Sequence, residues 1–283
     1  MQYLRAGAVK LRPSESLIVA RSSVRTGPLP DAVSAYESVF AAGIGTAEDR
    51  FEYAAALARL GRHDAAVREF RKIRAPRALA TSAGFRAARS LVRSGRISEG
   101  TAALQSLIRR FPNDTATAVA RYLLADLATD DRRDVEARRL FREIGRRFPA
   151  HRLASVAAFR GATITWTRDS AERAAAEFDS VVRRYSLSED ASASRYWAGR
   201  AWAAAGDSTN ARARWHLVLG TDSATYYAGL SAVRLGLEPW QPARVADPDP
   251  EGTPFAAAAA RATLLDRVGM DDEALYGDRK SVV

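Results

Sequence analysis

A four-residue motif recurs along this chain at a fixed interval and limits the folds open to it. Arg109-Arg110-Phe111-Pro112 returns as Arg146-Arg147-Phe148-Pro149 and, in altered form, as Arg183-Arg184-Tyr185-Ser186, so the aromatic residue recurs every 37 positions. A period of this length is typical of helix-hairpin repeats. One such hairpin cannot bury its apolar face alone, whereas stacked neighbours can. The repeat therefore predicts a solenoid.

Turn signals alternate with the repeated motif and divide the chain into helix-length segments. They are Gly61-Arg62, Gly95-Arg96, Thr129-Asp130-Asp131, Arg168-Asp169 and Gly206-Asp207. Glycine is expected to end the first helix of a hairpin in the left-handed conformation, and Asp or Ser to cap the second. Apolar residues recur at helical spacing between the turns, and no run is typical of a strand. The prediction is an all-α chain, an α-solenoid of stacked TPR-like helix hairpins wound into a right-handed superhelix.

The predicted superhelical domain covers residues 1–236, and two earlier helices are expected near 14–25 and 31–42. A proline-rich, acidic linker follows at 237–254 because its prolines favour extended backbone. Apolar spacing then predicts the start of a further helical hairpin over 255–277.

The last six residues, Asp278 to Val283, match the reading of a common short-read sequencing adapter. We expect residues 278–283 to be an artefact and the chain to be a fragment, so they are kept out of the fold prediction. Synonymous codons that differ from the adapter would disprove this.

Composition excludes several classes of site. The chain has no cysteine and only three histidines, which excludes disulfides and thiolate metal sites and leaves no His-rich motif. We predict no cofactor and no metal. No apolar stretch is long enough to span a bilayer, and no signal peptide is visible. The net charge of +10 fits either an anionic partner or arginine-rich exposed helix faces. Acidic residues are mixed among the basic ones, so no specific nucleic-acid partner is predicted.

A series of motifs near the C-terminus has a distinctive order. It comprises Tyr196-Trp197-Ala198-Gly199-Arg200-Ala201, Gly206-Asp207, Tyr226-Tyr227-Ala228-Gly229-Leu230, Arg234-Leu235-Gly236 and the hairpin sequence Leu264 to Ala274. Over roughly residues 190–276 this series resembles the last repeats of the superhelical domain of soluble lytic transglycosylases. Upstream of residue 190, only the general pattern of TPR-like helices and turns supports the match.

The resemblance implies a periplasmic scaffold that lies beside a catalytic domain, with peptidoglycan glycan strands or envelope proteins as partners. The family's catalytic glutamate lies in a Glu-Ser context, followed by Gly-Leu-Met-Gln and Met-Pro-x-Thr-Ala elements. None of these strings occurs in this chain, so no catalytic residue can be assigned.

Aromatic residues are densest in the region of this resemblance. Trp197 and Trp215 are expected in the core because they fall at helical spacing. Tyr196 and Trp202 are expected to be exposed and, with Tyr226 and Tyr227, form the candidate ligand or partner surface.

Two functions remain open, together with a weaker third. The first is the non-catalytic superhelical scaffold of a lytic transglycosylase, positioning glycan strands. The alternative is a stand-alone TPR-repeat adaptor that binds a peptide or helix in its groove. A nucleic-acid-binding solenoid would rest on net charge alone, and its affinity would fall steeply with salt.

Overall fold

The computed structural model describes residues 11–221, 223–238, 241, 256–267 and 270, and within them the chain is all helical. It divides into two compact units, Met1–Pro239 and Trp240–Val283. The first unit contains the helices α2 (Pro13–Thr26), α3 (Leu29–Ala41), α4 (Ala47–Arg59), α5 (His63–Arg71), α6 (Arg77–Arg93), α7 (Ile97–Arg110), α8 (Ala116–Asp130), α9 (Asp134–Arg147), α10 (Ala154–Arg168), α11 (Ala171–Arg184), α12 (Asp190–Ala204), α13 (Ser208–Thr221) and α14 (Tyr226–Leu235). The second contains α15 (Ala256–Arg267).

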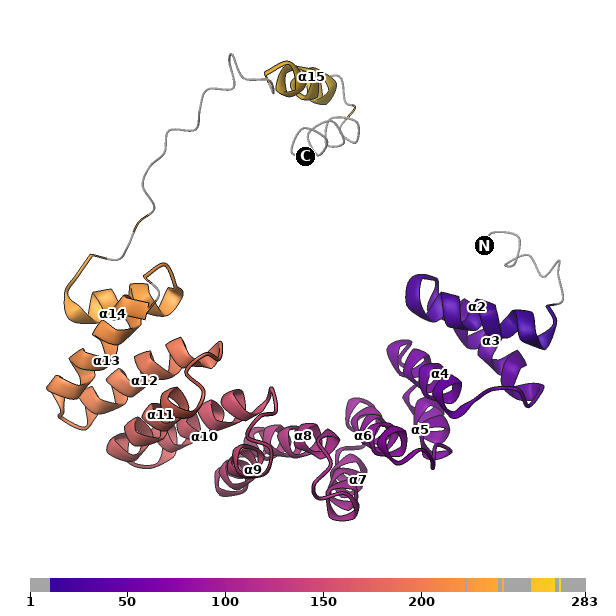
Figure 1. Cartoon of the computed structure of the whole chain (residues 1–283), viewed down its shortest axis with the longest axis horizontal. Coiled ribbons are helices and arrows are strands. Elements are labelled where there is room, and N and C mark those ends of the chain that lie inside the picture. The colour runs from indigo at the N-terminus through magenta and orange to yellow at the C-terminus, as the bar shows by residue number, and fades with distance from the viewer. Residues whose placement is uncertain (1–10, 222, 239–240, 242–255, 268–269, 271–283) are drawn as a thin grey trace. The chain divides into compact units, whose positions relative to one another are not determined.

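Each helix of the first unit packs on the one before it and the one after it (Figure 1). Six antiparallel hairpins result, from α2–α3 to α12–α13, and α14 packs on the last of them. The first helix of a hairpin also contacts the first helix of the next hairpin. Examples are the contacts between α4 and α6 and between α6 and α8. This is the nearest-neighbour stacking of a repeat solenoid, so the predicted fold class is confirmed.

Three hairpin turns have the predicted left-handed glycine, but the second helices α5 and α7 begin without the predicted Asp or Ser cap. Gly61, Gly95 and Gly206 have φ angles of +75°, +82° and +86°, in the left-handed region that glycine enters without a steric penalty. The α8–α9 turn has the same conformation at Arg132, with φ of +58°. A side chain there costs about 1–2 kcal/mol, which glycine would avoid.

The recurring motif forms the same helix end three times. Phe111, Phe148 and Tyr185 have φ of −131°, −132° and −134°, and each backbone N–H donates to the carbonyl four residues earlier. The residue therefore leaves the helical conformation while it still closes the last turn. Sequence repetition is thus repetition of local geometry as well.

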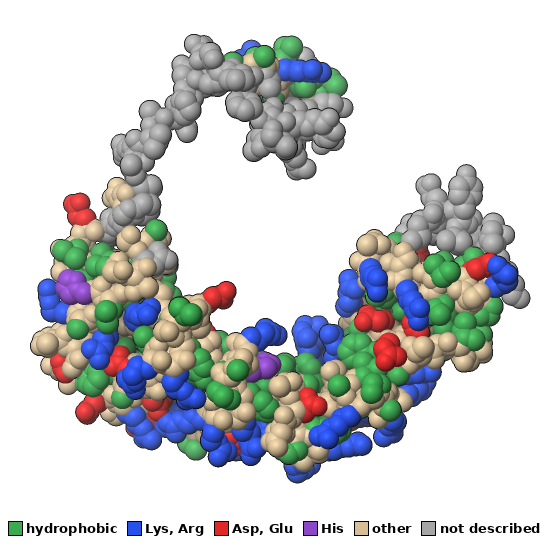
Figure 2. All heavy atoms as spheres, viewed as in Figure 1, with side chains coloured by type: hydrophobic (Ala, Val, Ile, Leu, Met, Phe, Trp, Pro, Cys, Tyr) green, Lys and Arg blue, Asp and Glu red, His purple; other side chains and the backbone are tan. Residues whose placement is uncertain are grey.

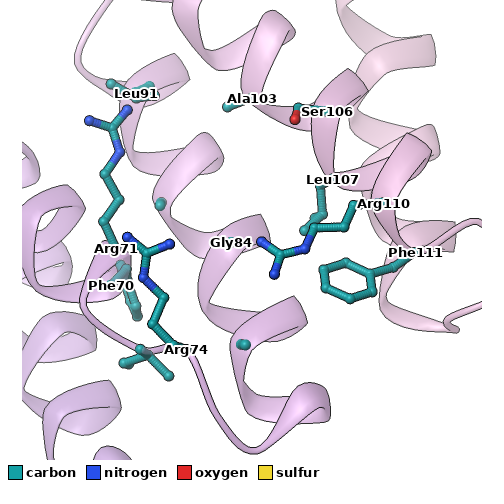
Figure 3. A pocket seen from close by; sticks show the side chains of 13 residues that line it. Phe70, Arg71, Arg74, Gly84, Leu91, Ala103, Ser106, Leu107, Arg110 and Phe111 are labelled. Atoms are coloured by element: carbon teal, nitrogen blue, oxygen red, sulfur yellow. The ribbon is translucent and has the colours of Figure 1, made fainter.

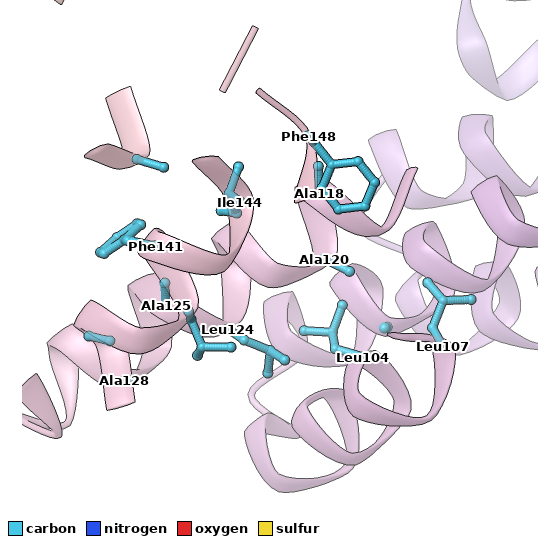
Figure 4. Close-up of a cluster of buried hydrophobic side chains, with 14 of the residues drawn as sticks. Leu104, Leu107, Ala118, Ala120, Leu124, Ala125, Ala128, Phe141, Ile144 and Phe148 are labelled. Atoms are coloured by element: carbon cyan, nitrogen blue, oxygen red, sulfur yellow. The ribbon is translucent and has the colours of Figure 1, made fainter. Parts of the chain in front are cut away.

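Buried apolar side chains form clusters that run from hairpin to hairpin. The central cluster joins α6 to α10 and contains Leu104, Leu124, Phe141 and Ile144, all at most 8 % exposed (Figure 4). Many of its other members are alanines, which let the helices approach closely. Each hairpin therefore shares its core with the next.

The second unit is described only at Gln241, α15 and Met270. Helix α15 coincides with the helix expected after the proline-rich linker, whereas most of 237–254 and the rest of 255–277 lie outside the described residues, as do 278–283. The division into domains remains a prediction. Among the described helices, none has the length and hydropathy needed to cross a bilayer.

Candidate functional site

A cavity of about 360 Å³ opens between the helices α5, α6 and α7 (Figure 3). The second helix of one hairpin and both helices of the next contribute to it. It is lined by Phe70, Arg71, Ile73, Arg74, Ala80, Gly84, Ala87, Leu91, Ala103, Ser106, Leu107, Arg110 and Phe111. Its size is within the range of pockets that hold a ligand or a few side chains of a partner.

The base of the cavity is apolar. Phe70, Leu91 and Leu107 are each buried and belong to the cores of the hairpins that form the walls. Gly84 keeps the centre of the cavity open, since a Cβ there would lie 2.8 Å from Cδ1 of Leu107. An apolar side chain of a partner could therefore be buried against this base, with a gain of about 25 cal/mol for each Å² removed from water.

Three exposed arginines line the cavity: Arg71, Arg74 and Arg110. The Arg110 side chain extends toward Gly84 from one side, and Arg74 lies on the other side (Figure 3). The guanidinium of Arg110 also lies 5.1 Å from the centre of the Phe111 ring. The cavity thus combines an apolar base with several cationic groups.

None of these three guanidinium groups forms an ion pair within the described residues, and no Asp or Glu lines the cavity. The main partner of nearby Glu99 is Arg96, and Arg71 adds only a smaller electrostatic contribution to the lowered pKa of Glu99. Some arginines elsewhere in the solenoid do pair with carboxylates, as Arg50 does with Glu69 at 2.5 Å. The guanidinium groups that line this cavity therefore have no carboxylate at ion-pair distance within the described residues.

A second cavity, of about 310 Å³, occupies the same place two hairpins later, between α9, α10 and α11. Ala158, Ser180, Arg184 and Tyr185 line it at positions that lie 74 residues beyond Gly84, Ser106, Arg110 and Phe111. This agreement follows from the 37-residue period. The two cavities are repeat equivalents.

The hairpin between them places Arg121 at the equivalent position, 37 residues beyond Gly84. Arg121 is 2 % exposed, which is unusual for an arginine. Its Nη1 donates to Thr117 Oγ1 at 2.8 Å, and its Nε lies 3.4 Å from Glu143 Oε2. Its guanidinium also lies 5.5 Å from the ring centre of Phe148. Burial lowers the pKa of Arg121, and Glu143 acts in the opposite direction.

These contacts place the Arg121 side chain in the space that is open in the neighbouring hairpins. Glu143 and Phe148 are the repeat equivalents of Ser106 and Phe111, which line the first cavity. The central hairpin is therefore closed by its own arginine. The residue at this repeat position is thus small beside the two cavities, at Gly84 and Ala158, and large at Arg121.

The aromatic residues that the sequence singled out do not form one exposed surface. Tyr196 is only 4 % exposed, so the prediction that it is exposed is wrong. Its ring packs 5.6 Å from Tyr227 and 5.7 Å from Trp197, which places it inside the α12–α14 core. Trp215, 7 % exposed, lies in the core as predicted, whereas Trp197 is only partly buried.

The other members of this group have mixed environments. Trp202 is half-buried, and its Nε1 donates to Asp179 Oδ2 at 3.0 Å. Asp179 is also paired with Arg214 at 2.9 Å, so the indole is held by a polar network. Tyr227 is half-buried, and Tyr226 is 74 % exposed. A binding role for Trp202, Tyr226 and Tyr227 remains a prediction.

Arg71, Arg74 and Arg110 were not identified from the sequence. The net charge does not single them out, since the chain is rich in arginine throughout. The available signal was the repeat itself, because Gly84 and Ala158 are small where Arg121 is large. In the described residues, no cluster of three or more His, Asp or Glu could hold a metal ion.

Comparisons with known proteins agree on the fold. A model of the tetratricopeptide repeat matches residues 82–114, which include most of α6 and all of α7. The C-terminal part of a TPR repeat-containing protein from Cytophaga hutchinsonii aligns with a TM-score of 0.61 and 14% identity, over 81% of this chain and 91% of that one. A signal transduction ATPase with a tetratricopeptide repeat sensor from Pyrococcus horikoshii aligns with a TM-score of 0.56 and 14% identity, over 80% of this chain and 38% of that one.

No curated protein sequence matches the chain. The comparisons therefore establish a solenoid of TPR-like hairpins and lend no support to the transglycosylase resemblance. At 14% identity, the structural neighbours bear on the fold alone.

Proposed function

We propose that this chain is a protein-interaction scaffold that takes up a segment of a partner protein in the cavity between α5, α6 and α7. The observation that carries the proposal is a concave site with an apolar base and three arginines that lack ion-pair partners. Tightly bound interfaces commonly combine buried apolar anchors with arginine. The TPR-like fold supports a protein partner, since stacked hairpins offer extended surfaces for peptides and helices.

This proposal is tested by selecting peptides from a displayed random library on the purified chain. The selected peptides are expected to slow hydrogen exchange in α5, α6 and α7, because a bound segment would cover the cavity walls. An irrelevant peptide of equal length serves as the control. Peptides that protect only α12 to α14 would contradict the proposed site and favour a surface around Tyr226.

The scaffold of a lytic transglycosylase is the second candidate function, and its support is the motif series over residues 190–276. In that case the partners would be glycan strands or envelope proteins, and the location would be periplasmic. The solenoid would hold a separate catalytic domain and cut nothing itself. The α5–α7 cavity would then be available to an envelope protein.

Sequencing the source gene beyond the codon of Gly277 tests this candidate. The expected result is an open frame that continues into Glu-Ser and Gly-Leu-Met-Gln elements. A frame that ends after Val283 in the source DNA would exclude it and would also disprove the adapter origin of residues 278–283. A continuing frame without those elements would exclude the transglycosylase alone.

A further inference from the structure

We infer that the α5–α7 cavity is specific for an acidic segment, in which carboxylates flank one apolar side chain. The inference rests on the proposed function and specifies its ligand. The apolar base receives the side chain, and the arginines receive the carboxylates. Arg71, Arg74 and Arg110 supply the positive charge, and no acidic residue of the lining competes for it.

Arginine suits this role because its planar guanidinium can form two parallel hydrogen bonds to one carboxylate. Arg74 and Arg110 lie on opposite sides of Gly84, so carboxylates on both sides of a central anchor residue would find partners. Arg77 also has its guanidinium 5.2 Å from the Phe111 ring, which adds charge at the same edge. The site is therefore complementary to negative charge around an apolar group.

The closed central hairpin supplies an independent argument about charge. There, the cationic Arg121 is accompanied by Glu143, 3.4 Å from its Nε. In the open cavities the equivalents of Glu143 are Ser106 and Ser180, which cannot neutralise a cation. A lysine or arginine of a partner would thus meet like charge in the α5–α7 cavity, without a carboxylate in its lining. Ser106 at the position of Glu143 therefore disfavours a cationic ligand in the α5–α7 cavity.

The second open cavity is less suited to an acidic ligand. Glu177 lines it, forms an ion pair with Arg142 and accepts a hydrogen bond from Thr165 Oγ1 at 2.7 Å. Arg184 is also engaged, since its Nη2 donates to the Gly145 carbonyl at 3.0 Å. The α5–α7 cavity is therefore the main site.

A nucleic acid fits the cavity less well than a peptide. Binding along a phosphate backbone needs a continuous basic groove, usually with aromatic rings on which bases stack. Acidic side chains lie among the basic ones over the surface of the first unit (Figure 2). The apolar base of the cavity suits a side chain instead.

Two fluorescein-labelled peptides test the inference by fluorescence anisotropy. One is Gly-Ser-Glu-Asp-Phe-Glu-Asp-Ser-Gly, and the other replaces each Glu and Asp by Gln and Asn. We expect the acidic peptide to bind at least about tenfold more tightly, since each tenfold corresponds to about 1.4 kcal/mol and charged hydrogen bonds contribute that much each. Equal affinities of the two peptides would overturn the inference.

A variant that copies the closed hairpin provides the decisive comparison. Gly84→Arg with Ser106→Glu reproduces Arg121 and Glu143 in the α5–α7 cavity, and we expect it to weaken the acidic peptide about tenfold or more. The matched control, Ala158→Arg with Ser180→Glu, closes the second cavity and should leave the affinity within about twofold. Unchanged binding to the first variant would overturn the inference.

A second variant is needed in case the first misfolds, because a Cβ at position 84 would lie 2.8 Å from Cδ1 of Leu107. Arg74→Gln with Arg110→Gln changes only exposed side chains and should reduce the preference for the acidic peptide to about twofold or less. If library peptides protect α5–α7 but carry no excess of Asp and Glu, the inference fails and the proposed function stands. If a DNA oligonucleotide competes with the acidic peptide and binds the closed variant equally well, the cavity is not the site, and the inference fails.

Discussion

Phe141→Ala is expected to lower the free energy of unfolding by about 3–5 kcal/mol, the usual cost of removing a buried aromatic ring. Phe141 is fully buried in the central cluster. Its ring meets Tyr122 edge-on at 5.5 Å, and the Arg160 guanidinium lies 5.2 Å from its centre. The ring thus joins α8, α9 and α10. Its loss weakens the interface between two successive hairpins as well as one hairpin.

The same variant should also change the cooperativity of unfolding. In a solenoid, stability is the sum of hairpin terms and nearest-neighbour interfaces, so a weakened central interface can let the two sides unfold separately. All five tryptophans follow Phe141 in the sequence, whereas helical circular dichroism reports the whole chain. Tryptophan fluorescence and circular dichroism should coincide in urea for the wild type and separate for the variant.

Val135→Ala is the matched control for this experiment. Val135 lies in the same helix α9 but is 87% exposed, so its removal should change stability by no more than about 0.5 kcal/mol. A loss below about 1 kcal/mol in Phe141→Ala would show that the ring is not held as described. If Phe141→Ala loses much stability but its fluorescence and circular dichroism transitions still coincide, only the separate unfolding of the two sides is disproved.

The sequence was sufficient to predict the fold because the repeat, the turns and the helix periodicity all agree. Gly61, Gly95 and Gly206 adopt the predicted left-handed turns, and the repeated aromatic position ends three helices in the same way. These are local features, determined by a few neighbouring residues. The left-handed Arg132 had no such signal, because no glycine stands at that turn.

The candidate site was not predicted because it depends on a comparison between hairpins. Gly84 looks like an ordinary helix glycine, and Arg121 like one more surface arginine, until both are placed at the same repeat position. Charge counting also fails, since it cannot distinguish Arg74 from arginines that pair with carboxylates. Tyr196 was placed at the surface for a similar reason: helical spacing does not show that α14 covers its face.

Gly199→Ala is expected to destabilise the chain by about 1–3 kcal/mol, although alanine is the better helix former. Gly199 lies in α12, where an added Cβ would stand 2.4 Å from Nε1 and 2.7 Å from Cδ1 of Trp215. The indole cannot easily move, since it is 7% exposed and its Nε1 donates to the Tyr196 carbonyl at 3.3 Å. The methyl group must therefore push α12 and α13 apart.

Gly229→Ala is the matched control, because Gly229 lies within the helix α14 and a Cβ there would meet nothing within 4 Å. It should stabilise the chain by about 0.5–1 kcal/mol through helix propensity. Urea unfolding of the two variants should therefore give opposite signs. If both substitutions stabilise, the contact between Gly199 and Trp215 is looser than described.

Trp215→Phe in the Gly199→Ala background tests the cause of that loss. The smaller ring makes room for the methyl group, so the double variant should lose less stability than the sum of the two single variants, by about 0.5–3 kcal/mol. Gly199 belongs to the Tyr-Trp-x-Gly element on which the transglycosylase resemblance partly rests. Such coupling would show that helix packing requires a glycine at position 199. The presence of Gly199 would then say nothing about a glycan ligand. If the two losses are additive, packing against Trp215 does not explain Gly199. A binding role for this region would then be tested by substituting the exposed Tyr226.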